Sequence, residues 1–81
     1  MACTFSANGA RWTVWAIGPG LNDELRMARG INAMTGLYFQ ASDGEERLLP
    51  LGPVDFAALG ELTGRSNQEL AALAERATLR S

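Results

Sequence analysis

Residues 36–51, GLYFQASDGEERLLPL, contain the feature that most restricts the fold of this chain. Asp43-Gly44 separates two segments of apolar and β-forming residues. An Asp-Gly pair readily adopts the positive φ angles of a tight hairpin turn. The segment therefore predicts two antiparallel strands, over 37–41 and 46–51. Pro50 cannot donate a ladder hydrogen bond, so we expect the second strand to lie at a sheet edge or to end there.

The length of the turn decides which side chains share a face. With a two-residue loop, Phe39 faces Leu48, and both belong to the core with Leu37 and Ala41. A three-residue loop moves the pairing by one and places Tyr38 opposite Leu48. We expect the first register because it buries Phe39, and a one-residue slip flips the apolar set of a strand. The other face then carries Tyr38, Gln40, Arg47 and Leu49.

A third strand is predicted over residues 10–17, ARWTVWAI. Alternation places Trp12, Val14 and Ala16 on one face and Thr13, Trp15 and Ile17 on the other. Both faces are apolar, so this strand is central in its sheet, or another element or chain covers its second face. The preceding Asn8-Gly9 allows two interpretations: a hairpin with a short N-terminal strand, or a loose N-terminal arm.

Three helical segments are expected. Asn22 as N-cap, followed by Asp23 and Glu24, predicts a helix over roughly 23–29, with a longer helix to 34 or a loop as alternatives. Its apolar stripe comprises Leu21, Leu25, Ala28, Ile31 and Met34. Asp55 can cap a short turn carrying Phe56, Leu59 and Leu62. The last helix begins at a capping box of Ser66 and Glu69 and buries Leu70, Leu73, Ala74 and Ala77.

These segments predict an α+β fold in a single domain over residues 1–81. Three antiparallel strands form the sheet, with a short N-terminal strand as a further member if the first hairpin forms. The C-terminal helix packs on the sheet, and a second helix links strands one and two. The pieces RWTVW, LYF, DGEERLL, PLGPVDF and ELAALAERA resemble a group of short bacterial proteins. That resemblance implies the same strand, hairpin and helix order, and it implies no function.

The inventory of reactive side chains is poor. The chain has no His, which removes the commonest general base and metal ligand, and Cys3 is its only cysteine. Glu45 and Glu46 are adjacent, so on a strand they point to opposite faces and make a poor carboxylate pair. We therefore expect no catalytic residues, no metal, no cofactor and no enzymatic activity. Uncharged runs such as 12–22 are too short to span a bilayer, and we expect a cytoplasmic protein.

The expected function is non-catalytic protein–protein interaction, as an adaptor, an inhibitor or a self-associating subunit such as a homodimer. Strand 10–17 gives this small chain an excess of apolar surface, which is typical of partner sites. The expected contact residues are Arg11, Trp15, Ile17, Tyr38, Arg47 and Leu49. The alternative is a nucleic-acid-binding sheet face using Trp15, Tyr38, Arg11 and Arg47. The formal net charge of −2 and the lack of Lys argue against general nucleic-acid binding.

Overall fold

The computed structural model of the chain describes residues 2–18, 20–31, 35–59, 62 and 64–79. In this part of the chain a five-stranded antiparallel sheet has the order β1-β2-β3-β4-β5. Each strand pairs with the next one along the chain. The strands are β1 (Ala2–Ala7), β2 (Ala10–Ile17), β3 (Gly36–Ala41), β4 (Glu46–Pro50) and β5 (Thr78–Leu79).

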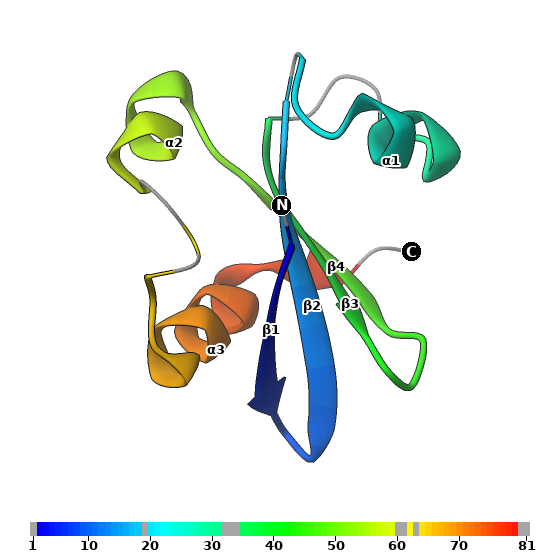
Figure 1. Cartoon of the computed structure of the whole chain (residues 1–81), viewed down its shortest axis with the longest axis vertical. Helices are drawn as coiled ribbons and strands as arrows, with labels where there is room; N and C mark the ends of the chain where they lie inside the picture. Colours follow the sequence, from blue (N-terminus) through cyan, green and yellow to red (C-terminus); the bar gives the residue numbers. More distant parts are fainter. Residues whose placement is uncertain (1, 19, 32–34, 60–61, 63, 80–81) are drawn as a thin grey trace.

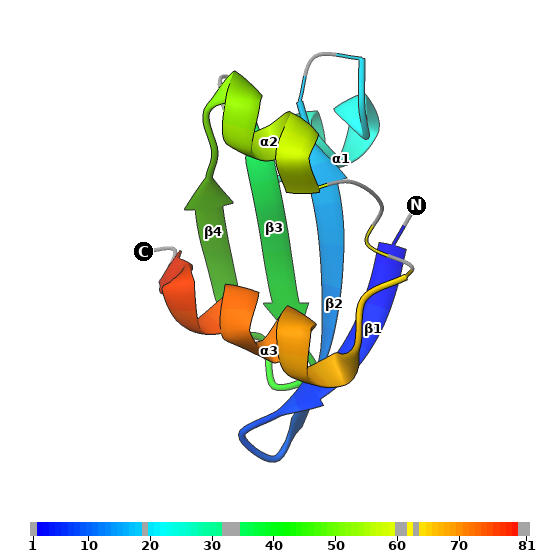
Figure 2. The ribbon, with the colours of Figure 1, turned by 90° about the vertical axis from the view of Figure 1, so that its left-hand side faces the viewer.

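Helices cover the sheet from both sides (Figures 1 and 2). The helices are α1 (Asp23–Ala28), α2 (Pro53–Leu59) and α3 (Asn67–Arg76). Helices α2 and α3 lie on one face, which we call the α3 face, and α1 lies on the opposite face, which we call the α1 face. The fold is therefore α+β with an antiparallel sheet and a helix near the C-terminal end, as expected from the sequence. The short strand β5, which follows α3 and pairs with β4, was not predicted.

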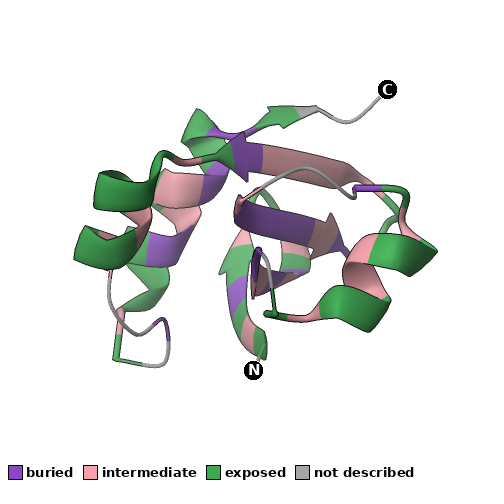
Figure 3. Cartoon of the chain, turned by 90° about the horizontal axis from the view of Figure 1, so that it is seen from above, coloured by how far each residue is buried: buried purple, intermediate pink, exposed green. Residues whose placement is uncertain are grey.

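The main core lies between the sheet and helices α2 and α3. Strand residues Phe5, Trp12, Val14, Leu37 and Phe39 pack there against Leu70 and Ala74 of α3. The Phe5 and Trp12 rings are stacked, with centroids 6.2 Å apart, and the Phe5 ring meets Phe39 edge-on. Figure 3 shows the buried residues concentrated where the middle strands face the helices.

The N-terminal segment forms a hairpin, which decides between the two interpretations of Asn8-Gly9. Both turn residues have positive φ, 52° for Asn8 and 76° for Gly9, as a two-residue hairpin turn requires. The turn pairs Ala7 with Ala10 and continues to the pair Ala2 and Trp15. Strand β2 is therefore central, with β1 and β3 on its two sides.

The register predicted for the second hairpin is wrong, and the three-residue alternative is correct. Tyr38 lies opposite Leu48, and Phe39 lies opposite Arg47. Residues 42–44 form the loop, the Ala41 N–H donates to the Glu45 oxygen at 2.8 Å, and Gly44 has φ 96°. The Asp43 carboxylate also accepts from the Glu45 N–H at 3.0 Å.

The slip leaves β3 as predicted, because alternation alone buries Phe39, and it turns over β4. Leu49 therefore joins the core on the α3 face, and Leu48 packs on the α1 face. Leu48 and Leu49 are adjacent and equally apolar, so the sequence does not indicate which of the two faces the core.

The helix predicted over 23–29 is confirmed as α1, but Asn22 does not cap it as expected. Asn22 is left-handed, with φ 55° and ψ 43°, and its side chain makes no cap hydrogen bond. Its amide nitrogen instead donates to the Ala16 oxygen at 2.5 Å. Gly18 and Leu21 form a backbone bridge that turns the chain back toward α1. Met34, the last residue of the predicted stripe, lies outside the described residues.

The capping box predicted at the last helix is confirmed. The Ser66 hydroxyl accepts from the Glu69 N–H at 3.2 Å, and the Glu69 carboxylate accepts from the Ser66 N–H. Arg65 links this start to α2, because its guanidinium donates to the Leu59 oxygen and pairs with Glu69 at 3.0 Å. Asp55 lies in the first turn of α2, which begins at Pro53, so the predicted capping of that helix by Asp55 is wrong.

Candidate functional site

The α1 face has two halves, one covered by α1 and one open. In the covered half, Ile17, Ile31 and Tyr38 form a second buried cluster, with Trp15, Leu25 and Leu48 packed around it. Leu25 and Ile31 come from α1 and the turn that follows it. The second apolar face of β2 is therefore covered by an element of the same chain, as one of the two sequence interpretations required.

The burial of this cluster corrects part of the predicted contact surface. Ile17 and Tyr38 each have 0% of their surface exposed. The Tyr38 hydroxyl also forms a hydrogen bond with the Glu46 carboxylate. These two side chains are core residues and cannot make the first contact with a partner.

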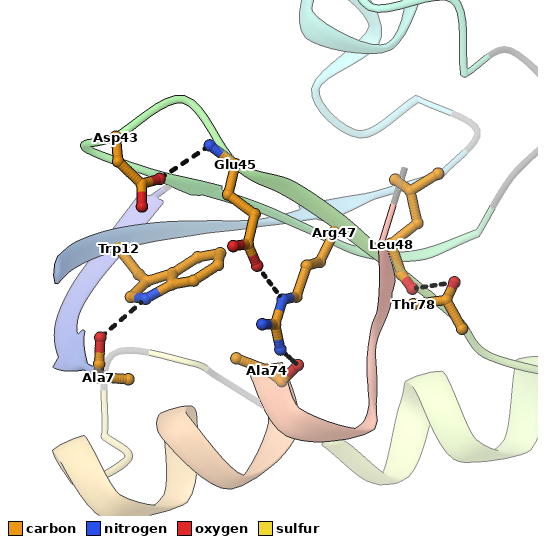
Figure 4. A network of polar contacts seen from close by, with 8 residues as sticks. All are labelled: Ala7, Trp12, Asp43, Glu45, Arg47, Leu48, Ala74 and Thr78. Carbon is orange, nitrogen blue, oxygen red and sulfur yellow. Dashed lines mark hydrogen bonds and ion pairs between the residues drawn. The ribbon is translucent and has the colours of Figure 1, made fainter. Parts of the chain in front are cut away.

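Arg47 and Leu49 lie on the opposite side of the sheet from Trp15, which is a second correction. Leu49 is 7% exposed and belongs to the core under α2 and α3. The Arg47 Nη1 donates to the Ala74 oxygen of α3 at 3.0 Å, and its Nε pairs with Glu45 at 2.6 Å (Figure 4). The slipped register of β4 causes both displacements, because it moves every side chain of that strand to the other face.

Of the predicted contact residues, Trp15 and Arg11 remain accessible on the α1 face. The Trp15 ring stacks on Tyr38, with centroids 5.5 Å apart and an interplanar angle of 29°. Trp15 is partly buried, and Arg11 is exposed near the end of the second hairpin. The Arg11 oxygen accepts from the Ser42 N–H at 2.8 Å, which ties this end of β2 to the loop.

Sequence reasoning missed a row of polar side chains that completes the open half. Thr4, Thr13, Gln40 and Glu46 lie opposite one another across four consecutive strands. Directly opposite residues of an antiparallel sheet have side chains on one face, about 4.5–5.5 Å apart at Cβ. The row runs parallel to the row that contains Trp15, Tyr38 and Leu48. The correct loop length would have revealed it, because the register places Glu46 opposite Gln40.

We define the open half as Arg11, Thr13, Gln40 and Glu46, together with Trp15, which lies at its boundary with the covered half. Thr4 continues the polar row onto β1. Figure 1 shows why this half is open. Helix α1 lies over the end of the sheet where it connects to β2 and β3. At the opposite end, near the hairpin loops, no helix among the described residues covers the α1 face. The surface combines one large aromatic ring with side chains that donate and accept hydrogen bonds. No group of three His, Cys, Asp or Glu side chains suited to a metal occurs in the described part of the chain.

Comparison of the chain with known protein families, with curated proteins and with solved structures finds no match. The resemblance to short bacterial proteins thus remains an expectation drawn from the sequence. None of the helices in the described ranges combines the length and apolar character needed to cross a membrane.

Proposed function

We propose that this chain is a non-catalytic protein-binding module whose contact surface is the open half of the α1 face. The observation that carries the proposal is the position of Trp15. Its ring stacks on the buried Tyr38 at an interplanar angle of 29°, and the residue is only partly buried beside the polar row. Tryptophan is among the residues most enriched at binding hot spots, because it buries a large rigid area at low entropy cost.

The surroundings of Trp15 match the usual organisation of a contact surface. A hot-spot aromatic is surrounded by side chains that exclude water and satisfy hydrogen bonds across the interface. Thr13 and Gln40 lie on one side of the ring, and Arg11 lies farther along the same strand. The exposed guanidinium favours a partner with an acidic group at that position. The expected cytoplasmic location remains part of this proposal.

Replacing Trp15 itself is a poor test, because the ring also packs on Tyr38 and its loss disturbs the fold. The sharper test changes Thr13, which lies in the open half and is only partly buried. We expect Thr13→Arg to keep the fold and to abolish capture of a partner from the native cell. The capture uses the tagged full chain as bait, with captured proteins identified by mass spectrometry.

The matched control is Gln68→Arg, which adds the same charge at an exposed position of α3 on the other side of the sheet. A partner that the native bait and Gln68→Arg retain, but Thr13→Arg loses, supports the proposal. A partner that all three baits retain equally places the contact elsewhere and overturns the proposed surface. Circular dichroism of each bait shows that its fold is intact.

A further inference from the structure

Strand β1 forms one edge of the sheet, and Figure 1 looks onto this edge, with the three helices to either side of it. The two-residue turn makes Ala7 and Ala10 a hydrogen-bonded pair. Hydrogen-bonded and non-hydrogen-bonded pairs therefore alternate along β1 from this point. Cys3, Phe5 and Ala7 direct their backbone groups toward β2. Ala2, Thr4 and Ser6 therefore direct their backbone N–H and C=O groups outward, away from the sheet.

Asn67 already occupies the outward groups of Ser6. The Ser6 N–H donates to Asn67 Oδ1 at 2.7 Å, and Asn67 Nδ2 donates to the Ser6 oxygen at 2.9 Å. This side chain thus takes the place of a neighbouring strand at one position and independently confirms the direction of the ladder. The described residues show no hydrogen bond from Asn67 to Ala2 or Thr4, and both residues are exposed.

Among the described residues, this part of the edge lacks the features that usually prevent strands from pairing. Natural edge strands are protected by charged side chains, proline, bulges or a covering element. Strand β1 has the sequence ACTFSA, which contains neither a charge nor a proline, and its pairing with β2 is regular throughout. Within the described ranges, the side chain of Asn67 protects the Ser6 end.

We propose that β1 of a second copy of this chain pairs with this edge, antiparallel and related by a twofold axis. Such a pair forms its hydrogen bonds only between residues with outward groups. Asn67 occupies the outward groups of Ser6, so Ala2 and Thr4 are the residues left to pair. In the register that uses both of them, Ala2 of each copy pairs with Thr4 of the other copy. Cys3 then lies opposite Cys3 of the second copy, in a non-hydrogen-bonded pair with Cα atoms about 4.5 Å apart.

The lack of charged side chains near the β1 edge favours a second copy of this chain as the strand that pairs there. A twofold axis brings each side chain close to its own copy, so any charge near the axis would meet a like charge. Residues 2–10 carry no charged side chain, and Asn67, which binds Ser6, is uncharged. Cys3 is partly buried beside the core on the α3 face, and a second Cys3 on the same face would cover it further. The paired segment is short, which is typical of small, weak interfaces below about 1,200 Å².

The test uses Cys3 as a reporter of the register. Two cysteines can form a disulfide when their Cα atoms are about 4.4–6.8 Å apart. We expect the thiol oxidant diamide to convert the full chain to a covalent dimer, visible on a non-reducing gel and reversed by dithiothreitol. The matched control is the double variant Cys3→Ser/Thr4→Cys, whose thiols lie diagonally, with Cα atoms about 7–8 Å apart. We expect at least a tenfold loss in the rate of its cross-linking.

A second pair of variants tests the backbone hydrogen bonds. Thr4→Pro removes an outward N–H and leaves the pairing of β1 with β2 intact, whereas Thr4→Val keeps the N–H and the β-branched shape. Analytical ultracentrifugation at rising concentration should show the mass of the native chain and of Thr4→Val approaching twice the monomer mass. Thr4→Pro should stay monomeric with an unchanged circular dichroism spectrum.

Equal rates of cross-linking for the native chain and for the Cys3→Ser/Thr4→Cys double variant would overturn the proposed register. A native chain that stays monomeric at millimolar concentration would overturn the pairing itself. Thr4 lies opposite Thr13, so the edge adjoins the open half of the α1 face. The edge tests measure self-association of the purified chain, whereas the Thr13→Arg test measures capture of a different protein, so the failure of one is distinguishable from the failure of the other.

Discussion

The guanidinium carbon of Arg47 lies 5.1 Å from the centroid of the Trp12 ring, between the sheet and α3. This contact exists because β4 pairs with β3 in the three-residue register, which turns Arg47 toward the core side. The same guanidinium donates to the Ala74 oxygen near the C-terminus of α3 (Figure 4). Cations near the C-terminus of a helix are favoured by its dipole and by its unsatisfied carbonyl groups. Arg47 therefore fastens the last helix to the sheet.

Replacing Arg47 should reduce stability. We expect Arg47→Ala to lower the free energy of unfolding by about 1–3 kcal/mol, since it removes a cation–π contact and a hydrogen bond to Ala74. Arg11→Ala, at an exposed position, should change it by about 0.5 kcal/mol or less. Urea denaturation followed by tryptophan fluorescence measures both. Equal effects of the two changes would contradict the structural role of Arg47.

Phe39 supports the main core independently of the register. It has no exposed surface, and the ring of Phe5 meets it edge-on at 6.2 Å. We expect Phe39→Ala to cost about 3–5 kcal/mol, which is enough to unfold a domain of this size. Its neighbour Gln40 lies on the α1 face, so Gln40→Ala serves as the control. A Phe39→Ala chain with nearly native stability in urea would show that the core lies elsewhere.

Gly36 begins β3 at a position that no other residue can occupy without strain. Its φ is 152°, and a Cβ there would lie 2.1 Å from the Leu49 oxygen of β4. We expect Gly36→Ala to destabilise the protein by about 2–6 kcal/mol, because β3 and β4 must separate to admit the methyl group. Gly52→Ala is the control, since a Cβ at Gly52 meets nothing within 4 Å. Thermal unfolding monitored by circular dichroism compares them, and similar midpoints would contradict the close approach.

The capping box predicts a smaller effect at the start of α3. Ser66→Ala removes the acceptor of the Glu69 N–H and should lower stability by about 1 kcal/mol. Gln68→Ala, in the same turn and exposed, should have little effect. Measured midpoints in urea that do not differ between these two variants would show that the cap contributes nothing to folding.

Nucleic acid should not bind to the chain in a general way. The net charge is −2 and there is no lysine, so little counterion release is available from a phosphate backbone. Tyr38 is buried and Arg47 lies on the other face, which removes two of the four side chains suggested for such a surface. Gel shifts at low salt with single- and double-stranded DNA and RNA should show no retention. Sub-micromolar binding that weakens steeply with salt would establish the nucleic-acid alternative.

Local features of the sequence determined most of the elements. The two Asn-Gly and Asp-Gly turns, the alternation in ARWTVWAI and the spacing of Ser66 and Glu69 act over a few residues, so they can be predicted without the fold. They correctly indicated the strand over 10–17, the strands of the second hairpin, the last helix and the separation of Trp12 from Trp15, and they left the N-terminal segment open between a hairpin and a loose arm. The helix over 23–28 was also found, because its acidic first turn and apolar spacing are local signals.

The tertiary structure decided which face each β4 residue occupies and what covers β2. Leu48 and Leu49 are interchangeable in sequence, so the register depends on the hydrogen bonds of the loop and on the cores that lie on both faces. The position of α1 depends on Asn22. The side chain of Asn22 donates a hydrogen bond to the Ala16 oxygen and does not cap the helix. These contacts join groups that are distant in sequence or compete for one partner. They leave Arg11 exposed and Trp15 partly buried, and they bury Ile17, Tyr38 and Leu49. Only the assembled sheet shows that Asn67 reaches Ser6 and leaves Ala2 and Thr4 exposed at the edge.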